Sequence, residues 1–175
     1  PVLVAGASSG IGAATARSLA AAGHPVALGA RRESDLAELK AGIEAAGGEA
    51  FAQRLDVGDG ESVAAFVAAT TEALGDIEAV VSSAAILRPG RLAQVATDDF
   101  EQEINVNVLG VQRLVRAVVP GMVERRRGDV VLVSSDVADT VRPYMSAYAT
   151  AKWAVEGFAR SLRLELEGTG VRVGV

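Results

Sequence analysis

Two kinds of segment alternate along the chain. Short apolar runs, rich in valine, alanine and leucine, end at glycine or at small polar residues, which is typical of buried strands. Longer segments between them carry apolar residues at helical spacing. The predicted strands are Val2–Ala5, Pro25–Ala30, Glu49–Val57, Glu78–Ser82, Asp129–Ser135 and Gly170–Val175.

The predicted helices are Gly10–Ala22, Asp35–Ala46, Glu61–Leu74, a long one from Thr97 or Asp98 to Arg127, and Ala147–Glu167. We expect the long helix to bend near Pro120 and Gly121. Strict alternation of strands and helices with short connections predicts an α/β fold, a doubly wound parallel sheet with three αβα layers. Ligands of such sheets bind beyond the carboxyl ends of the strands.

The 175 residues are enough for one domain with a substantial core, so residues 1–175 are interpreted as a single domain. The chain begins inside a predicted strand without an initiator methionine and stops inside another. We therefore expect that the natural protein is longer, most of all at the C-terminus, where a final strand and a segment covering the substrate would follow.

Composition and charge exclude several classes of protein. Half of the residues are hydrophobic, as a sheet covered on both faces requires, but no apolar run approaches the roughly 20 residues of a membrane span. A net charge of −5 argues against a nucleic-acid partner. The absence of cysteine and the single histidine, His24 in a predicted turn, argue against disulfides and a metal site and fit a cytoplasmic location.

The first chemical signal is the glycine-rich turn between the first strand and the first helix. Its three glycines, Gly6, Gly10 and Gly12, would permit the sharp turn, the approach of a diphosphate to the backbone, and close packing of helix on strand, respectively. Free N–H groups and the positive end of the helix dipole would then attract an anion. The alternative is a tight turn that binds nothing.

The second signal lies near the start of the last predicted helix. Tyr148 and Lys152 are four residues apart, so both side chains lie on one helix face. A nearby ammonium favours the phenolate, so we expect a lowered pKa for Tyr148, as a general acid/base requires. Ser135 ends the fifth predicted strand at the same sheet edge and is placed to bind a substrate oxygen. Alternatively, the lysine is solvated and Ser134 and Ser135 bind strand-end backbone groups.

In combination, these motifs resemble the short-chain dehydrogenase/reductase family of Rossmann-fold oxidoreductases. The resemblance covers essentially the whole chain. It rests on Gly6-Ala7-Ser8-Ser9-Gly10-Ile11-Gly12, Asp56-Val57, Asn107-Val108-Leu109-Gly110, Ser134-Ser135 and Tyr148-Ala149-Thr150-Ala151-Lys152. It implies a nicotinamide cofactor and hydride transfer between that cofactor and a small carbonyl or secondary alcohol substrate.

The resemblance also implies roles for individual residues. Tyr148 would be the acid/base, Ser135 would orient the reacting oxygen, and Lys152 would lower the tyrosine pKa and hold the ribose. Asn107 would hold a water in the proton relay. Asp56 would contact the adenine amino group with Val57 beside the ring. The remaining expected cofactor contacts are Gly6, Ser8, Ser9, Gly10, Ile11, Gly12, Ser83 and Ala84.

One segment departs from the family pattern. Where the family usually has Asn-Asn-Ala-Gly after the fourth strand, this chain has Ser82-Ser83-Ala84-Ala85. The methyl group of Ala85 would crowd the nicotinamide ribose. This departure motivates an alternative function, a catalytically idle NADP-binding regulatory or interaction protein of the same fold.

The end of the second strand predicts which cofactor is preferred. An NAD site places an acidic residue there to bind the ribose 2′-hydroxyl, whereas this chain has Ala30 followed by Arg31 and Arg32. Arginine suits a phosphate, so NADP(H) is predicted. NAD(H) remains the alternative if Glu33 binds the hydroxyl instead of starting the next helix.

We also expect a homodimer or homotetramer, because the last helix carries apolar residues on more than one face. The large ones are Trp153, Phe158, Leu162 and Leu166. The small residues Ala149, Ala154 and Gly157 would let two such helices approach closely.

Overall fold

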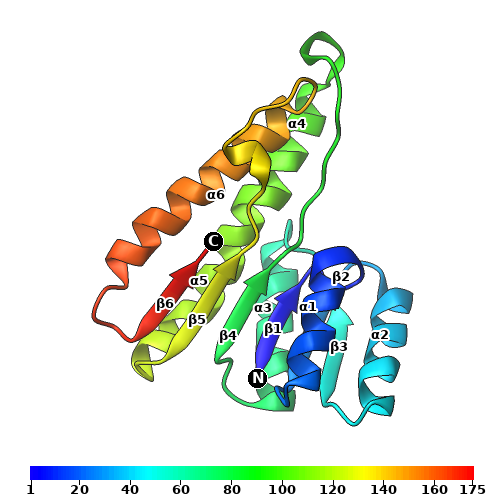
Figure 1. Cartoon of the computed structure of the whole chain (residues 1–175), viewed down its shortest axis with the longest axis vertical. Coiled ribbons are helices and arrows are strands. Elements are labelled where there is room, and N and C mark those ends of the chain that lie inside the picture. The colour runs from blue at the N-terminus through cyan, green and yellow to red at the C-terminus, as the bar shows by residue number, and fades with distance from the viewer.

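In the computed structural model, which describes residues 1–175 throughout, six strands form one sheet in the order β3-β2-β1-β4-β5-β6 (Figure 1). The strands are β1 (Val2–Ala5), β2 (Val26–Ala30), β3 (Ala50–Arg54), β4 (Ala79–Ser82), β5 (Gly128–Leu132) and β6 (Val171–Gly174). All neighbouring strands are parallel. The chain crosses from β3, at one edge of the sheet, to β4, so the direction of winding reverses between the neighbouring strands β1 and β4. The doubly wound α/β sheet predicted from the sequence is confirmed.

Helices cover both faces of the sheet (Figure 1). On one face lie α1 (Gly10–Ala21) and α2 (Glu33–Ala45); on the other lie α3 (Gly60–Leu74), α5 (Gly110–Glu124) and α6 (Ser146–Glu165). Strand β1 shows why both layers form, because its residues alternate between them. Val2 and Val4 pack with α1 and α2, whereas Leu3 packs with the opposite helices.

Several strands are shorter than predicted, and the differences place functional residues in loops. Strand β5 ends at Leu132, so Ser135 lies three residues beyond it and caps the short helix η3 (Asp136–Ala138). Strand β3 ends at Arg54, so Asp56 lies in the following turn. In both cases polar side chains that bind nearby backbone groups end the strand earlier than the apolar pattern suggests.

The long predicted helix is interrupted at a different place from the one expected. It comprises α4 (Thr97–Ile104), a π-helical turn η2 (Asn105–Leu109) and α5, which includes Pro120 without ending there. By length and average composition alone the segment Thr97–Glu124 is sufficient to cross a membrane, although no such span was predicted from the sequence. In this fold it is a core helix, with Leu114 and Met122 fully buried under the sheet.

Candidate active site

The glycine-rich turn has the geometry expected of it. Gly6 and Gly10 have φ values of +86° and +54°, in the left-handed region that favours glycine. A Cβ atom on Gly12 would overlap the carbonyl oxygen of Gly6, so α1 packs on the turn at a distance only glycine permits. A Cβ atom on Gly6 would lie 2.6 Å from the backbone nitrogen of Ala84, which brings the loop after β4 against the turn.

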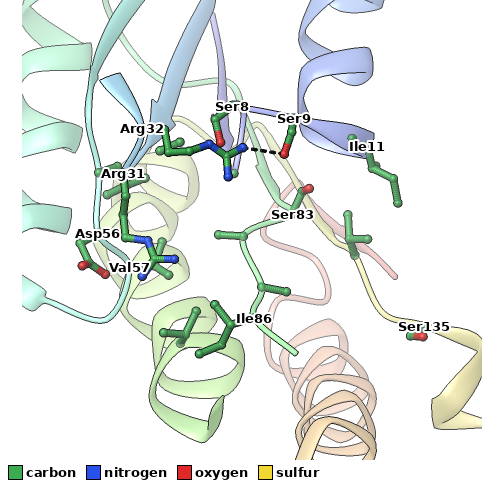
Figure 2. Close-up of a pocket in the computed structure, with 18 of the residues that line it drawn as sticks. Ser8, Ser9, Ile11, Arg31, Arg32, Asp56, Val57, Ser83, Ile86 and Ser135 are labelled. Atoms are coloured by element: carbon green, nitrogen blue, oxygen red, sulfur yellow. Dashed lines mark hydrogen bonds between the residues drawn. The ribbon is translucent and has the colours of Figure 1, made fainter. Parts of the chain in front are cut away.

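A cleft of about 480 Å³ opens at this edge of the sheet, beside the junction of β1 and β4 (Figure 2). It is lined by Gly6, Ser8, Ser9, Gly10, Ile11, Ala30, Arg31, Arg32, Leu55, Asp56, Val57, Ser83, Ala84, Ala85, Ile86, Val106, Val133, Ser134, Ser135, Tyr148 and Lys152. The structure thus brings together every residue proposed from the sequence except Gly12 and Asn107, which lie behind the wall of the cleft.

The two arginines after β2 differ in their surroundings. Arg32 donates from its Nε to Asp35 at 2.5 Å and from Nη2 to the hydroxyl of Ser9 at 2.9 Å. Arg31 extends toward Asp56 and Val57 without an ion-pair partner in the chain (Figure 2). Arg31 is therefore the arginine whose guanidinium is available to a ligand.

Glu33, considered from the sequence as an alternative ligand of the ribose 2′-hydroxyl, begins helix α2 and does not line the cleft. The carboxylate that pairs with Arg32 is that of Asp35, at i+3. This pairing was within reach of sequence reasoning, because residues three apart at a helix start are neighbours.

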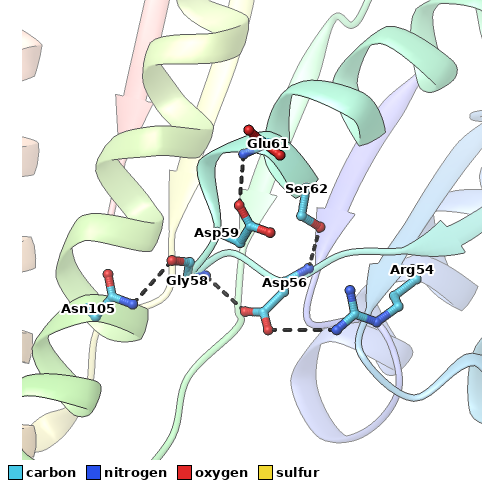
Figure 3. A network of polar contacts seen from close by, with 7 residues as sticks. All are labelled: Arg54, Asp56, Gly58, Asp59, Glu61, Ser62 and Asn105. Atoms are coloured by element: carbon cyan, nitrogen blue, oxygen red, sulfur yellow. Dashed lines mark hydrogen bonds and ion pairs between the residues drawn. The ribbon is translucent and has the colours of Figure 1, made fainter. Parts of the chain in front are cut away.

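Asp56 lines the cleft and also holds the turn after β3 (Figure 3). Its Oδ1 accepts the N–H of Gly58 at 3.0 Å, and its own N–H donates to the hydroxyl of Ser62 at 2.9 Å. Three residues after Asp56, Asp59 caps α3 by accepting the N–H of Glu61. The expected adenine contact and the simpler turn-capping role of Asp56 are thus geometrically compatible.

The pKa of Tyr148 differs from the expectation. Burial of the phenol raises its pKa above the usual value near 10, the hydrogen bond with Ser135 lowers it, and the charges of Asp136 and Glu103 raise it further. The net shift is upward, so the predicted lowering is wrong for the protein alone. Tyr148 is therefore a protonated donor throughout the neutral range.

Lys152 does not reverse this upward shift of the Tyr148 pKa. Its side chain is only 4% exposed, and its Nζ donates to the carbonyl oxygen of Val133 at 2.7 Å. Burial lowers the pKa of Lys152 to about 8. The Nζ atom lies 5.4 Å from the centre of the Tyr148 ring, so the two residues are neighbours as predicted. At that separation the ammonium does not outweigh the burial of the phenol.

Asn107 occupies a position that sequence spacing did not reveal. Its side chain is 1% exposed, its Oδ1 accepts the N–H of Ile86, and its Nδ2 donates to the carbonyl oxygen of Ile86, both at 2.8 Å. The side-chain amide is therefore committed to the backbone rather than turned toward a water in the cleft. Two residues earlier in the same π-helical turn, Asn105 donates to the carbonyl oxygen of Gly58 at 3.2 Å (Figure 3).

Further residues that were not predicted from the sequence also line the cleft. The apolar ones are Leu55, Ile86, Val106 and Val133. Their apolar side chains look like ordinary core residues in the sequence, so no local signal marked them. Ser134 also lines the cleft, and its buried hydroxyl has no hydrogen-bond partner in the chain.

These features fit a dinucleotide. The left-handed glycines leave room for phosphates, Arg31 is free to meet an anion, and the unpartnered Ser134 hydroxyl offers a polar contact. Chemically, the other end of the cleft combines a protonated phenol, a serine hydroxyl and a buried lysine. Such a set can deliver a proton to a substrate oxygen and stabilise charge on it.

The outer face of α6 is less apolar than predicted. Leu162 and Leu166 are buried in the core, and Phe158, which is partly buried, packs against it. Trp153 remains 50% exposed and Leu164 74% exposed. Together with the exposed Gly157, these residues are the part of the predicted interface that the fold leaves free.

Known proteins are similar to this chain over nearly its whole length. The family model described as short chain dehydrogenase matches residues 1–175. The chain is 40% identical over 171 residues to a glycine betaine reductase of Emericella nidulans, covering 98% of this chain and 14% of that protein. It is 41% identical over 173 residues to a putative ketoacyl reductase of the monensin polyketide synthase of Streptomyces virginiae, covering 98% and 66%. The chain spans less than two thirds of either relative.

Solved structures are similar along nearly the whole chain. An actinorhodin polyketide ketoreductase with NADPH is 33% identical, with a TM-score of 0.95, and the match covers 98% of this chain and 67% of that one. A metagenomic short-chain oxidoreductase in complex with NADP is 34% identical, with a TM-score of 0.94, covering 98% and 79%.

Proposed function

The chain belongs to the short-chain dehydrogenase family, and on that premise we propose that it is an NADP(H)-dependent oxidoreductase acting on a carbonyl or secondary alcohol. The observation that carries this proposal is the single cleft in which Arg31, the glycine-rich turn, Ser135, Tyr148 and Lys152 all take part. One end suits a phosphorylated adenosine and the other suits proton transfer to oxygen.

The cofactor preference rests on Arg31. Its guanidinium has no carboxylate partner, whereas Arg32 is already paired with Asp35. No acidic side chain stands at the end of β2 to accept from a ribose 2′-hydroxyl, since that position is Ala30. NADP and NADPH are the ligands of the similar structures described above, which supports the same choice here.

When bound, the cofactor supplies or accepts a hydride. In the reductive direction, the phenol of Tyr148 donates its proton to the carbonyl oxygen, which becomes the alcohol. Ser135 holds that oxygen by a hydrogen bond, for which its hydroxyl must leave Asp136, now 3.1 Å away. Lys152 is anchored by Val133 and stabilises the phenolate that remains.

The test compares nucleotide binding and turnover. NADPH and NADH are titrated against the protein while the fluorescence of Trp153, the only tryptophan, is followed, and oxidation of NADPH is then measured with a panel of ketones and aldehydes. The proposal expects tighter binding of NADPH and carbonyl-dependent oxidation. Absence of binding by both nucleotides would refute it.

One observation favours a second function, that of an NADP-binding protein without turnover. Ala85 lines the cleft where the family pattern has glycine, and its methyl group narrows the reacting end. NADPH binding with no turnover of any carbonyl would support this alternative. Restoration of turnover by Ala85→Gly would assign the loss to that methyl group.

A further inference from the structure

A buried carboxylate outside the proposed catalytic set holds the loop that follows β4. Glu103 on α4 is 1% exposed, and its Oε1 accepts the backbone N–H of Arg88 at 2.7 Å. Its second oxygen, Oε2, is buried without a partner. Burying an incompletely paired carboxylate is costly, so its presence calls for a physical explanation.

The explanation lies in the spacing between Glu103 and Asn107. The two side chains are four residues apart on one continuous helical run, with Glu103 in the last turn of α4 and Asn107 in the π-helical turn η2 that follows. The backbone groups they bind, those of Ile86 and Arg88, are two residues apart on the loop. About one turn of this run therefore holds two neighbouring points of the loop.

The middle of this loop has no backbone hydrogen bonds to other segments. Residues 83 to 91 form no strand or helix, and their backbone bonds to the rest of the fold lie at the two ends, from the N–H of Ser83 to the carbonyl oxygen of Ala5 and from the N–H of Gly90 to that of Tyr144. One end is pressed against the glycine-rich turn, where Ala84 leaves no room for a side chain on Gly6. Beyond it, Ala84, Ala85 and Ile86 form one wall of the cleft. The position of this wall therefore depends on the two side chains that hold Ile86 and Arg88.

We propose that Glu103 is a positioning residue that, together with Asn107, fixes the segment 84–88 as the wall against which the nicotinamide half of the cofactor and the substrate are held. This inference rests on the proposed function. Glu103 acts through the loop backbone and touches neither ligand. Loss of its carboxyl group should disturb the reacting end of the cleft and spare the end formed by Arg31 and Asp56.

Asp99 provides a natural control. It lies one turn earlier on α4 and pairs with the side chain of Arg88, the same residue whose backbone Glu103 holds. Both partners of that ion pair are nearly half exposed, and exposed ion pairs contribute little to stability. Asp99→Asn therefore removes a carboxylate beside Arg88 without touching the loop backbone.

The experiment measures binding of NADPH and of 2′,5′-ADP, which is the phosphorylated adenosine end alone, to Glu103→Leu, Glu103→Gln and Asp99→Asn. Glu103→Leu should weaken NADPH about tenfold or more and leave 2′,5′-ADP within about twofold, because only the reacting end loses its wall. Glu103→Gln retains an acceptor for Arg88 and should restore most of the affinity for NADPH. Asp99→Asn should match the unmodified protein.

Amide hydrogen exchange supplies a readout that does not need turnover. The amide of Arg88 should exchange slowly in the unmodified protein and in Glu103→Gln, and at least tenfold faster in Glu103→Leu. Fast exchange at Arg88 in the unmodified protein would overturn the proposal even if Glu103→Leu fails to fold. Equal weakening of NADPH and 2′,5′-ADP would also overturn it, since a general loss of structure affects both.

Failure of the proposed function gives a different result. If neither nucleotide binds the unmodified protein, the oxidoreductase assignment is wrong. Faster hydrogen exchange of the Arg88 amide in Glu103→Leu would then still show that Glu103 holds the loop in place.

Discussion

Lys152 and Val133 are joined by a 2.7 Å hydrogen bond from the buried ammonium to the backbone carbonyl just beyond β5. The bond supplies one of the three acceptors that an ammonium can use, and burial lowers the pKa of Lys152 to about 8. The folded protein therefore binds this proton less tightly than the unfolded chain, in which the pKa is near 10.5.

The first prediction follows from that difference. Between about pH 8 and pH 10.5 the unfolded chain retains a proton that the folded protein has released, so the contribution of Lys152 to stability rises with pH. Below pH 8 both states are protonated and the folded protein bears the full cost of the buried charge, roughly 3 kcal/mol. Urea unfolding between pH 7 and pH 10.5 measures the effect.

Two lysine variants separate this effect from other titrations. Lys152→Met should remove the rise, so its stability relative to the unmodified protein should be highest near pH 7 and should decline toward pH 10.5. Lys40→Met removes the only other lysine, which is paired with Glu44 on α2, and should follow the unmodified protein. A constant difference between Lys152→Met and the unmodified protein across this range would contradict the prediction.

Tyr148→Phe should abolish turnover while NADPH binding stays within about twofold, because the change removes only the transferable proton. Tyr144→Phe is the matched control: this tyrosine lies four residues earlier, before the start of α6, and is largely exposed. Initial rates and nucleotide titrations are compared for both variants. A Tyr148→Phe protein retaining more than a small fraction of the rate would rule out the acid/base assignment.

Arg31→Ala should weaken NADPH about ten- to a hundredfold and leave NADH nearly unchanged, because a charge-assisted contact to phosphate contributes about 1.5–3 kcal/mol. Arg32→Ala should have a smaller effect on this preference, since Arg32 already pairs with Asp35. Ala30→Asp should reverse the preference toward NADH by repelling the phosphate and accepting from the 2′-hydroxyl. Isothermal titration at low and high salt checks all three variants. Unmodified protein preferring NADH at low salt would refute the assignment.

Gly12→Ala should destabilise the protein by about 1–3 kcal/mol and weaken NADPH, because a Cβ atom there overlaps the Gly6 carbonyl and pushes α1 away from the turn. Gly42→Ala is the matched control. Gly42 also lies in a helix, but a Cβ atom on it meets nothing within 4 Å. This variant should gain up to about 1 kcal/mol from helix propensity. Equal effects of the two changes in urea unfolding would disprove the packing argument.

A homodimer or homotetramer is expected to form through the outer face of α6, although this face is narrower than the sequence suggested. Trp153→Glu should lower the mass measured by sedimentation equilibrium at micromolar concentration, because it places a charge in the apolar contact. Leu92→Glu alters an equally available apolar residue in the short helix η1 (Leu92–Gln94) and should leave the mass unchanged. A monomeric unmodified protein would remove the prediction.

Much of the fold was readable because its signals are local. The apolar runs alternate with helical segments, and glycines mark the turns at which the backbone has a positive φ, such as Gly6. The strand ends were not readable to the same precision. Apolar Val133 continues the pattern of β5, yet the strand has ended at Leu132, because the chain turns there to let Ser135 cap η3.

The contacts of the site were likewise predicted where they are local in sequence and missed where they join distant segments. Tyr148 and Lys152 are neighbours because four residues make about one helical turn. This contact could be predicted from their spacing in the sequence. The hydrogen bonds of Asn107 with Ile86 and of Glu103 with Arg88 join residues that are 21 and 15 positions apart. No periodicity in the sequence predicts such pairs. The upward shift of the Tyr148 pKa was missed for a related reason: it depends on burial and on carboxylates from other segments, Asp136 and Glu103.

The π-helical turn η2 has a consequence for the size of ligand that the cleft accepts. Asn105 binds the loop after β3, through Gly58, and Asn107 binds the loop after β4, through Ile86. Both anchors sit within a single turn of one helix, so the two walls cannot drift apart independently. This helical turn therefore sets the distance between the two loops, and with it the size of the ligand that fits between them.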